Sequence, residues 1–233
     1  MLECVKEVWL EEIAKEGFAI LPDVFRNDEM ASLLEAFTES SLFRTKAGIR
    51  HALNFGPVDA IAHDARLLAI ARRVLGENAI PFSATLFDKS PDANWLVVWH
   101  QDVALPLRHK KELTGWGPWS VKQGVIYAHA PAKTLEGVLA LRIHIDDSTS
   151  ENGPLRVLPK THKLGVLSGD SIESAVAKAK PDDCPVPRGG VLAMRPLLVH
   201  SSSKSRDDHP RRVLHIEYAA SNFMPDGLEL ARA

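Results

Sequence analysis

The 233-residue chain has little cysteine, little excess charge and no long apolar run, and each shortage argues against a class of protein. Its two cysteines, Cys4 and Cys184, lack metal-site spacing and are too few for a disulfide scaffold, which favours reduced thiols in a cytoplasmic protein. A formal net charge of −2 gives no reason to expect nucleic acid or an acidic membrane surface as partner. The start, MLECVKEVWLEEIAKEGFAI, is acidic without a long apolar core, so neither a signal peptide nor a membrane span is expected.

Two patterns divide the chain, which we expect to form a single domain over residues 1–233. Helical spacing dominates up to about residue 76, whereas short apolar runs separated by turn-rich clusters recur from about 80 to 220. These runs include FSATLF, WLVVW, GVIYAHA, VLALRIHI, GGVLAMRPLLVH and RVLHIEY. The pattern predicts a mainly β fold, a sandwich or jelly-roll barrel, with the N-terminal helices packed against its outside.

Besides an amphipathic N-terminal helix, with Val5, Val8, Trp9 and Ile13 at helical spacing, two helices are expected within the helix-rich part. One is NDEMASLLEAFTESSLF, with Asn27 or Asp28 as its N-cap. The other is DAIAHDARLLAIARRVLG, which we expect to run without a break to Gly76.

A histidine followed two residues later by a carboxylate occurs three times, where composition alone would produce roughly one such pair. Alternate residues of a strand point to one side, so each pair has the geometry either to bind one metal ion or to hydrogen-bond internally. The three pairs are His100/Asp102, His144/Asp146 and His215/Glu217. The motif alone does not choose among them.

Coordination chemistry supplies a criterion for the choice. Two histidines and one carboxylate on one face of an octahedral metal form the facial triad of non-haem Fe(II) oxygenases, which leaves three positions open. A third ligand must come from another strand, and His200 ends a long apolar run before a serine-rich turn. Arg211 then starts the next strand, where its guanidinium can pair bidentately with the carboxylate of a co-substrate. Arg212 should point to the opposite side of that strand.

The chain resembles the phytanoyl-CoA dioxygenase family of iron- and 2-oxoglutarate-dependent oxygenases. The matching segments are HQD, ENGPLRVLPKTHK and LLVHSSSKSRDDHPRR, in that order, with GFAILPDVF and LFDKSPDANW similar as well. The resemblance covers nearly the whole chain, from about Gly17 to Ala220. It implies a double-stranded β-helix, the cupin-like form of the jelly roll.

The resemblance also implies the roles of individual residues. His100, Asp102 and His200 would hold Fe(II), Arg211 would bind the far carboxylate of 2-oxoglutarate, and Ser202 would assist it. The enzyme would then consume 2-oxoglutarate and O2 and release succinate and CO2, with ascorbate as a supporting reductant. Related halogenases lack the carboxylate ligand, so Asp102 favours hydroxylation.

Departures from the family pattern bear on the substrate. Arg142 stands where relatives often carry an aromatic residue, and His144 shares its strand face, so both are candidates to line the pocket. The pairing of Arg142 with a protein carboxylate such as Glu217 is the alternative. The stretch at 108–124 matches no general family motif and is a natural place for substrate selection. We therefore expect a small or medium polar substrate rather than a long acyl chain.

Two other functions fit parts of the pattern. A catalytically silent jelly-roll ligand-binding protein would keep the fold without needing the complete triad. A metal-dependent hydrolase can use two histidines and a carboxylate as ligands. Arg211 discriminates between the dioxygenase and the hydrolase, because attack by water needs no carboxylate clamp.

Overall fold

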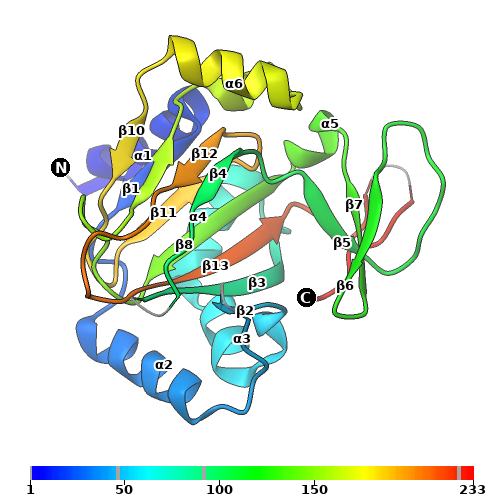
Figure 1. Cartoon of the computed structure of the whole chain (residues 1–233). Coiled ribbons are helices and arrows are strands. Elements are labelled where there is room, and N and C mark those ends of the chain that lie inside the picture. The colour runs from blue at the N-terminus through cyan, green and yellow to red at the C-terminus, as the bar shows by residue number, and fades with distance from the viewer. Residues whose placement is uncertain (1, 46–47, 91–92, 225–226) are drawn as a thin grey trace.

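The computed structural model describes residues 2–45, 48–90, 93–224 and 227–233, with side chains described from Val8 onward (Figure 1). The α-helices are α1 (Leu2–Glu16), α2 (Asn27–Glu39), α3 (Gly56–Ala62), α4 (Ala65–Leu75), α5 (Ala132–Leu135) and α6 (Gly169–Lys178), with short 3-10 helices η1 (Ala52–Asn54) and η2 (Thr161–Leu164). The strands are β1 (Phe18–Leu21), β2 (Gly48–Ile49), β3 (Ile80–Lys89), β4 (Val97–His100), β5 (Ala104–Leu107), β6 (Trp119–Lys122), β7 (Val125–His129), β8 (Val138–His144), β9 (Leu155–Val157), β10 (Asp182–Cys184), β11 (Val191–Met194), β12 (His200–Ser202) and β13 (Arg211–Ala219).

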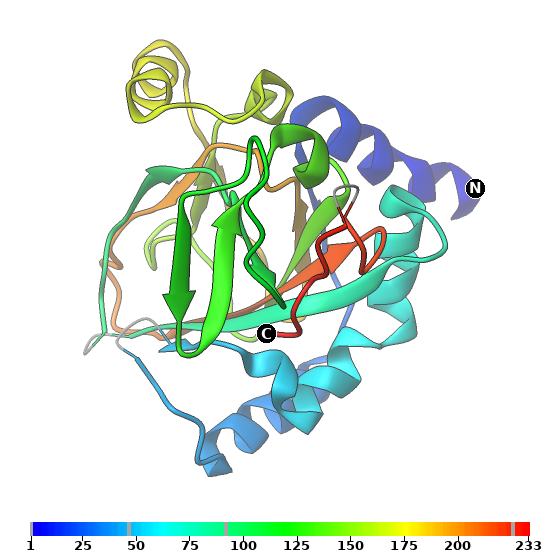
Figure 2. The same cartoon turned by 90° about the vertical axis from the view of Figure 1, so that its right-hand side faces the viewer.

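Two antiparallel sheets form the body of the fold. The larger has the strand order β1-β11-β8-β13-β3-β2, and the smaller has the order β10-β9-β12-β4. A third sheet, β5-β7-β6, stands beside them on the right in Figure 1 and in front of them in Figure 2. Side chains from the first two sheets line one cavity, so these sheets are the two walls of a jelly-roll barrel. The mainly β prediction is confirmed.

The N-terminal helices cover the outer face of the larger sheet. On β8, Leu141 and Ile143 are fully buried and belong to the same apolar cluster as Leu33 of α2 and Leu67 of α4. Alternation along β8 therefore sends its apolar set outward to the helices and Arg142, between them, into the barrel. The predicted packing of helices outside the barrel is confirmed.

The helix boundaries differ from the sequence prediction at two points. The N-cap of α2 is Arg26, whose backbone N–H donates to Glu29 Oε2 at 2.8 Å, so the expected cap at Asn27 or Asp28 is wrong. The expected continuous helix before Gly76 is two helices, α3 and α4. Asp64 interrupts it because its side chain accepts from the backbone N–H of Arg66 at 2.9 Å and so caps α4.

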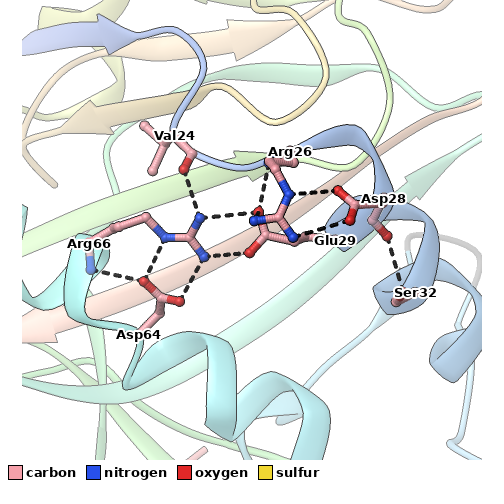
Figure 3. Close-up of polar contacts among 7 residues, drawn as sticks. All are labelled: Val24, Arg26, Asp28, Glu29, Ser32, Asp64 and Arg66. Carbon is pink, nitrogen blue, oxygen red and sulfur yellow. Dashed lines mark hydrogen bonds and ion pairs between the residues drawn. The ribbon is translucent and has the colours of Figure 1, made fainter.

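Arg66 joins the starts of α2 and α4 in one polar network (Figure 3). Its guanidinium lies 2.7 Å from Glu29 Oε1 and 2.8 Å from Asp64 Oδ2, and it donates to the carbonyl of Val24 at 3.1 Å. The guanidinium also lies 4.2 Å from the centre of the Phe25 ring. A single side chain thus fixes the relative placement of both helices on the sheet.

Of the two cysteines, the one whose side chain is described, Cys184, lies in an environment that does not favour reactivity. Cys184 is buried and free, and burial raises the pKa of its thiol to about 12. The side chain of Cys4 lies outside the described residues. Within the described chain, none of the helices has the length and apolar character that a membrane crossing needs.

Candidate metal and co-substrate site

His100 and His200 face each other across neighbouring strands. β4 and β12 pair antiparallel with these two residues directly opposite, and the ring centroids are 4.2 Å apart. Asp102 follows β4, where its backbone N–H donates to the carbonyl of Pro196 at 2.9 Å. Its two carboxylate oxygens each lie 3.5 Å from the Nε2 of one histidine. The three ligand atoms lie within 4.8 Å of one another, so the structure brings the predicted triad together.

The two histidine rings are oriented by the same local contact. Nδ1 of His100 lies 2.8 Å from the carbonyl of Val98, and Nδ1 of His200 lies 2.8 Å from the carbonyl of Leu198. Because a carbonyl only accepts, each Nδ1 carries the proton and each Nε2 keeps a lone pair toward Asp102. Metal-binding histidines are typically held in this way through their other nitrogen. Two imidazoles and one carboxylate fit a divalent first-row metal such as iron.

The charge states of the triad suit metal binding. Burial lowers the pKa of His200 to about 4, which keeps its ring neutral. Burial alone would raise the pKa of Asp102, but His200 and His100 lower it well below the usual range. Asp102 raises the pKa of His100 against the effect of burial, so the site offers one ionised carboxylate beside the neutral ring of His200, and metal binding competes with a proton at His100.

Gln101, between two members of the triad, fixes the end of β4. Its side-chain amide donates to the carbonyls of Gly165 at 2.9 Å and Leu197 at 2.7 Å. Its side-chain oxygen accepts from the backbone N–H of Leu167 at 2.8 Å. These three bonds tie the HQD segment to the segments before α6 and β12.

A cavity of about 380 Å³ opens from the triad into the barrel. Side chains of β3, β8 and β13 form one wall, those of β4 and β12 form the other, and the β6–β7 hairpin contributes as well. The 108–124 stretch, which matches no family motif, therefore supplies part of the cavity through β6.

Arg211 lies in this cavity and has a buried donor to offer. Arg211 and Lys89 are directly opposite on β13 and β3. Nη2 of Arg211 donates to Ser202 Oγ at 3.2 Å, and the Lys89 ammonium donates to the same oxygen at 2.9 Å. Ser202 Oγ in turn donates to the carbonyl of Gly153 at 2.9 Å. Nη1 of Arg211 is buried without a hydrogen-bond partner among the residues described, as an anion-binding group would be.

Electrostatics support an anion at this end of the cavity. Burial, together with the charges of nearby arginines, lowers the pKa of Arg211 to about 9 and that of Lys89 to about 7. Two cations opposite each other across strands repel, which a bound carboxylate would relieve. The far carboxylate of 2-oxoglutarate fits this arrangement. Arg212 points the other way, as predicted, and pairs with Asp146.

Of the two residues predicted to line the pocket, Arg142 does so and His144 does not. Arg142 lines the cavity, donates to Nδ1 of His215 at 2.9 Å and lies over the ring of Phe87. Arg142 thus contacts His215 and does not form the alternative pair with Glu217. His144 is buried but is not among the residues that line the cavity, so its expected role is wrong. It ends β8 opposite Val213, which does not line the cavity either.

Several residues in or beside the cavity have no role assigned from the sequence. Lys89 does not itself line the cavity but contacts Ser202, which does, and it was detectable because it continues the alternation of the cavity-lining Thr85 and Phe87 on β3. Arg50 and Lys122 also line the cavity, although they are 72 positions apart in the chain. Only the folded arrangement brings those two segments together, and no local pattern marks either residue.

The comparisons with known proteins agree with this geometry. The family model described as phytanoyl-CoA dioxygenase matches residues 13–213. A curated relative, a probable alpha-ketoglutarate-dependent hypophosphite dioxygenase of Stutzerimonas stutzeri, is 26% identical over 238 residues, which cover 92% of this chain and 73% of the relative.

Solved structures share the fold. The epimerase SnoN from nogalamycin biosynthesis, in complex with Fe3+, alpha ketoglutarate and nogalamycin RO, has a TM-score of 0.70 at 19% identity, over 94% of this chain and 85% of that one. EctD from S. alaskensis with 2-oxoglutarate and 5-hydroxyectoine has a TM-score of 0.69 at 20% identity, over 90% and 74% respectively. The chain belongs to the phytanoyl-CoA dioxygenase family of 2-oxoglutarate-dependent dioxygenases, as its sequence resemblance predicts.

Proposed function

We propose that this dioxygenase holds Fe(II) with His100, Asp102 and His200 and hydroxylates a small or medium polar molecule. The single observation that carries the proposal is the set of three ligand atoms within 4.8 Å of one another, in the cavity that Arg211 also lines. When bound, iron supplies the redox chemistry by which 2-oxoglutarate, O2 and substrate become succinate, CO2 and hydroxylated product.

The residues of the chain provide binding and orientation in this reaction. Arg211 receives the far carboxylate of 2-oxoglutarate with its unpartnered Nη1, and Ser202 holds the guanidinium in place. Val98 and Leu198 keep the two ligand rings turned toward Asp102 through their carbonyls. The barrel walls limit access of water to the reacting groups.

The polar lining of the cavity supports the choice of substrate. Arg142, His215 and Glu217 all line it, and an acyl chain would leave such groups without partners. The curated relative is named for hypophosphite, which is small and polar. A metal-dependent hydrolase or a silent binding protein has no evident use for Arg211 beside the triad. A cytoplasmic location, a single domain, and the absence of nucleic-acid and membrane partners stay predictions.

Succinate formation tests the proposal. Protein reconstituted with Fe(II), ascorbate and 2-oxoglutarate is given a panel of polar metabolites and, separately, acyl-CoA esters. We expect succinate above the uncoupled rate only with polar compounds, and none from Asp102→Ala. Stimulation by acyl-CoA esters alone would contradict the choice of substrate, and the absence of succinate under all conditions would contradict the dioxygenase site.

A further inference from the structure

The charged groups that line the cavity are mostly cationic. Four cations face it, and the two carboxyl groups are those of Asp102 and Glu217. The four cations are Arg50, Lys122, Arg142 and Arg211. Across the described ranges, none of these four side chains forms an ion pair with a protein carboxylate. Buried or partly buried cations without such partners are costly, so this excess calls for a ligand.

Iron and the co-substrate do not remove the excess of positive charge on the cavity lining. Fe(II) brings two positive charges and 2-oxoglutarate brings two negative charges, so their sum is zero. The lining then retains two positive charges when both carboxyl groups are ionised. Burial raises the pKa of Glu217 to about 8, which leaves that group neutral near pH 7 and the excess at three. The third reactant, the substrate, is the component left to balance the charge.

Two of these cations, Arg50 and Lys122, line the cavity from segments other than the strand that carries Arg211. Arg50 follows β2, and Lys122 ends β6 at the hairpin turn to β7. Burial and the charge of Arg50 lower the pKa of Lys122, whereas the carboxyl groups of Glu217 and Asp102 raise it by smaller amounts.

An aromatic side chain supports this pair in place of a carboxylate. The Lys122 ammonium lies 4.7 Å from the centre of the Tyr127 ring. The Tyr127 hydroxyl lies 3.1 Å from Nε2 of His51, the residue after Arg50. This contact joins the β6–β7 hairpin to the segment after β2, and these two segments carry Lys122 and Arg50.

We propose that the substrate is a small anion and that Arg50 and Lys122 bind its carboxylate or phosphonate-type group. When its anionic group is bound to these two residues, the rest of the substrate lies in the part of the cavity next to His100, Asp102 and His200. The inference rests on the proposed function, which it deepens by naming the substrate class and its anchor.

Anion binding to an inactive complex tests the anchor. Protein loaded with Zn(II) and 2-oxoglutarate, which occupies the Arg211 end, is titrated calorimetrically with methylphosphonate, acetate and the neutral analogue acetamide. We expect wild-type protein to bind at least one of the two anions and not acetamide. Comparison of the two anions shows which oxyanion the anchor prefers.

Substitutions identify the residues responsible. Arg50→Ala and Lys122→Ala should each weaken binding of the anion at least tenfold. Lys110→Ala, which removes an exposed cation of the same 108–124 stretch as Lys122, should change nothing. Arg50→Lys and Lys122→Arg keep the positive charge and should retain anion binding to within about threefold, because the anchor acts through charge. If an alanine variant does not fold, these charge-conserving variants test whether Arg50 and Lys122 bind the anion.

Failure of the anchor differs from failure of the dioxygenase site. Wild-type protein that binds neither anion, or alanine variants that bind as wild type does, would overturn the anchor while 2-oxoglutarate binding and succinate formation stay intact. Wild-type protein that does not bind 2-oxoglutarate would instead overturn the proposed function.

Discussion

Arg211 and Arg212 are consecutive in the chain but serve opposite faces of β13. Arg211 is 3% exposed and lies in the cavity against Ser202. Arg212 pairs with Asp146 through two contacts, at 2.6 and 2.8 Å, and so holds the segment that follows β8. One strand therefore carries a binding group and a structural ion pair at neighbouring positions.

This divergence predicts different effects on co-substrate binding. Arg211→Ala should weaken binding of 2-oxoglutarate to Zn(II)-loaded protein by about 2 kcal/mol or more, because a buried carboxylate loses its charged partner. Arg212→Ala should bind it nearly as wild type does. Calorimetric titration measures both constants, and the reverse ranking would show that the site uses the other face of the strand.

The triad should be required for metal binding. His200→Ala and Asp102→Ala should each lower the affinity for Co(II) by more than the roughly 10- to 100-fold that loss of a second-shell partner causes. His209→Ala is the matched control, because His209 also lies beside an aspartate, Asp207 at 2.6 Å, but on the surface. Visible absorption of the Co(II) complex reports the binding. Equal affinities in all three variants would exclude the triad.

Lys89 should give the protein a pH-dependent stability. Burial lowers the pKa of Lys89 from 10.5 to about 7, so between these values the unfolded chain binds a proton that the folded chain has lost. The free energy of unfolding therefore rises with pH across this window. Lys89→Met removes this contribution.

Urea titrations without 2-oxoglutarate measure the Lys89 effect. The stability of wild type relative to Lys89→Met should increase between pH 7 and pH 10 and stay constant below pH 6. A difference that does not change with pH would mean that Lys89 keeps its proton in the folded state.

The Arg66 network should stabilise the helices above the pKa values of its carboxylates. Hydrogen bonds from Arg66 lower the pKa values of Glu29 and Asp64, so the stabilisation is present above their ordinary values of 4.5 and 3.8 and is lost as pH falls through the lowered ones. Arg66→Ala should cost about 1 kcal/mol at pH 7.

The loss from Arg66→Ala should shrink toward pH 3, as measured by denaturant unfolding. Arg72→Ala, at an exposed position of α4, should have little effect at either pH. A loss of equal size at both pH values would assign the effect to the contact of the Arg66 guanidinium with the Phe25 ring instead.

Features set by local chemistry were predictable from the sequence. Turn-rich punctuation of short apolar runs predicts the barrel. Alternation predicts that Arg211 and Arg212 diverge, and the family resemblance selects Arg211 and Arg142 as the inward residues. The triad needed the family resemblance as well, because the register that places His200 opposite His100 is a pairing of distant strands. Spacing alone did not select it over the two other His-x-acid pairs.

The remaining features depend on three-dimensional context. Asp64 was predicted inside a helix because the apolar spacing continues past it, but its side chain caps a new helix there. His144 shares the face of Arg142 by alternation, yet the cavity ends before it. Arg50 and Lys122 line one cavity only because the hairpin folds against the segment after β2, and this long-range approach leaves no mark in either local sequence.

The contact between Arg142 and His215 determines where the imidazole proton of His215 resides. A guanidinium has no lone pair to offer, so Nδ1 of His215 must accept from it and the ring hydrogen must sit on Nε2. Burial lowers the pKa of His215 to about 3, so the ring takes up no second proton near neutral pH. The cavity wall therefore presents a fixed donor at this point. Between two molecules of equal size and charge, we expect the one that offers a lone pair to Nε2 to bind better than the one that offers only a hydrogen.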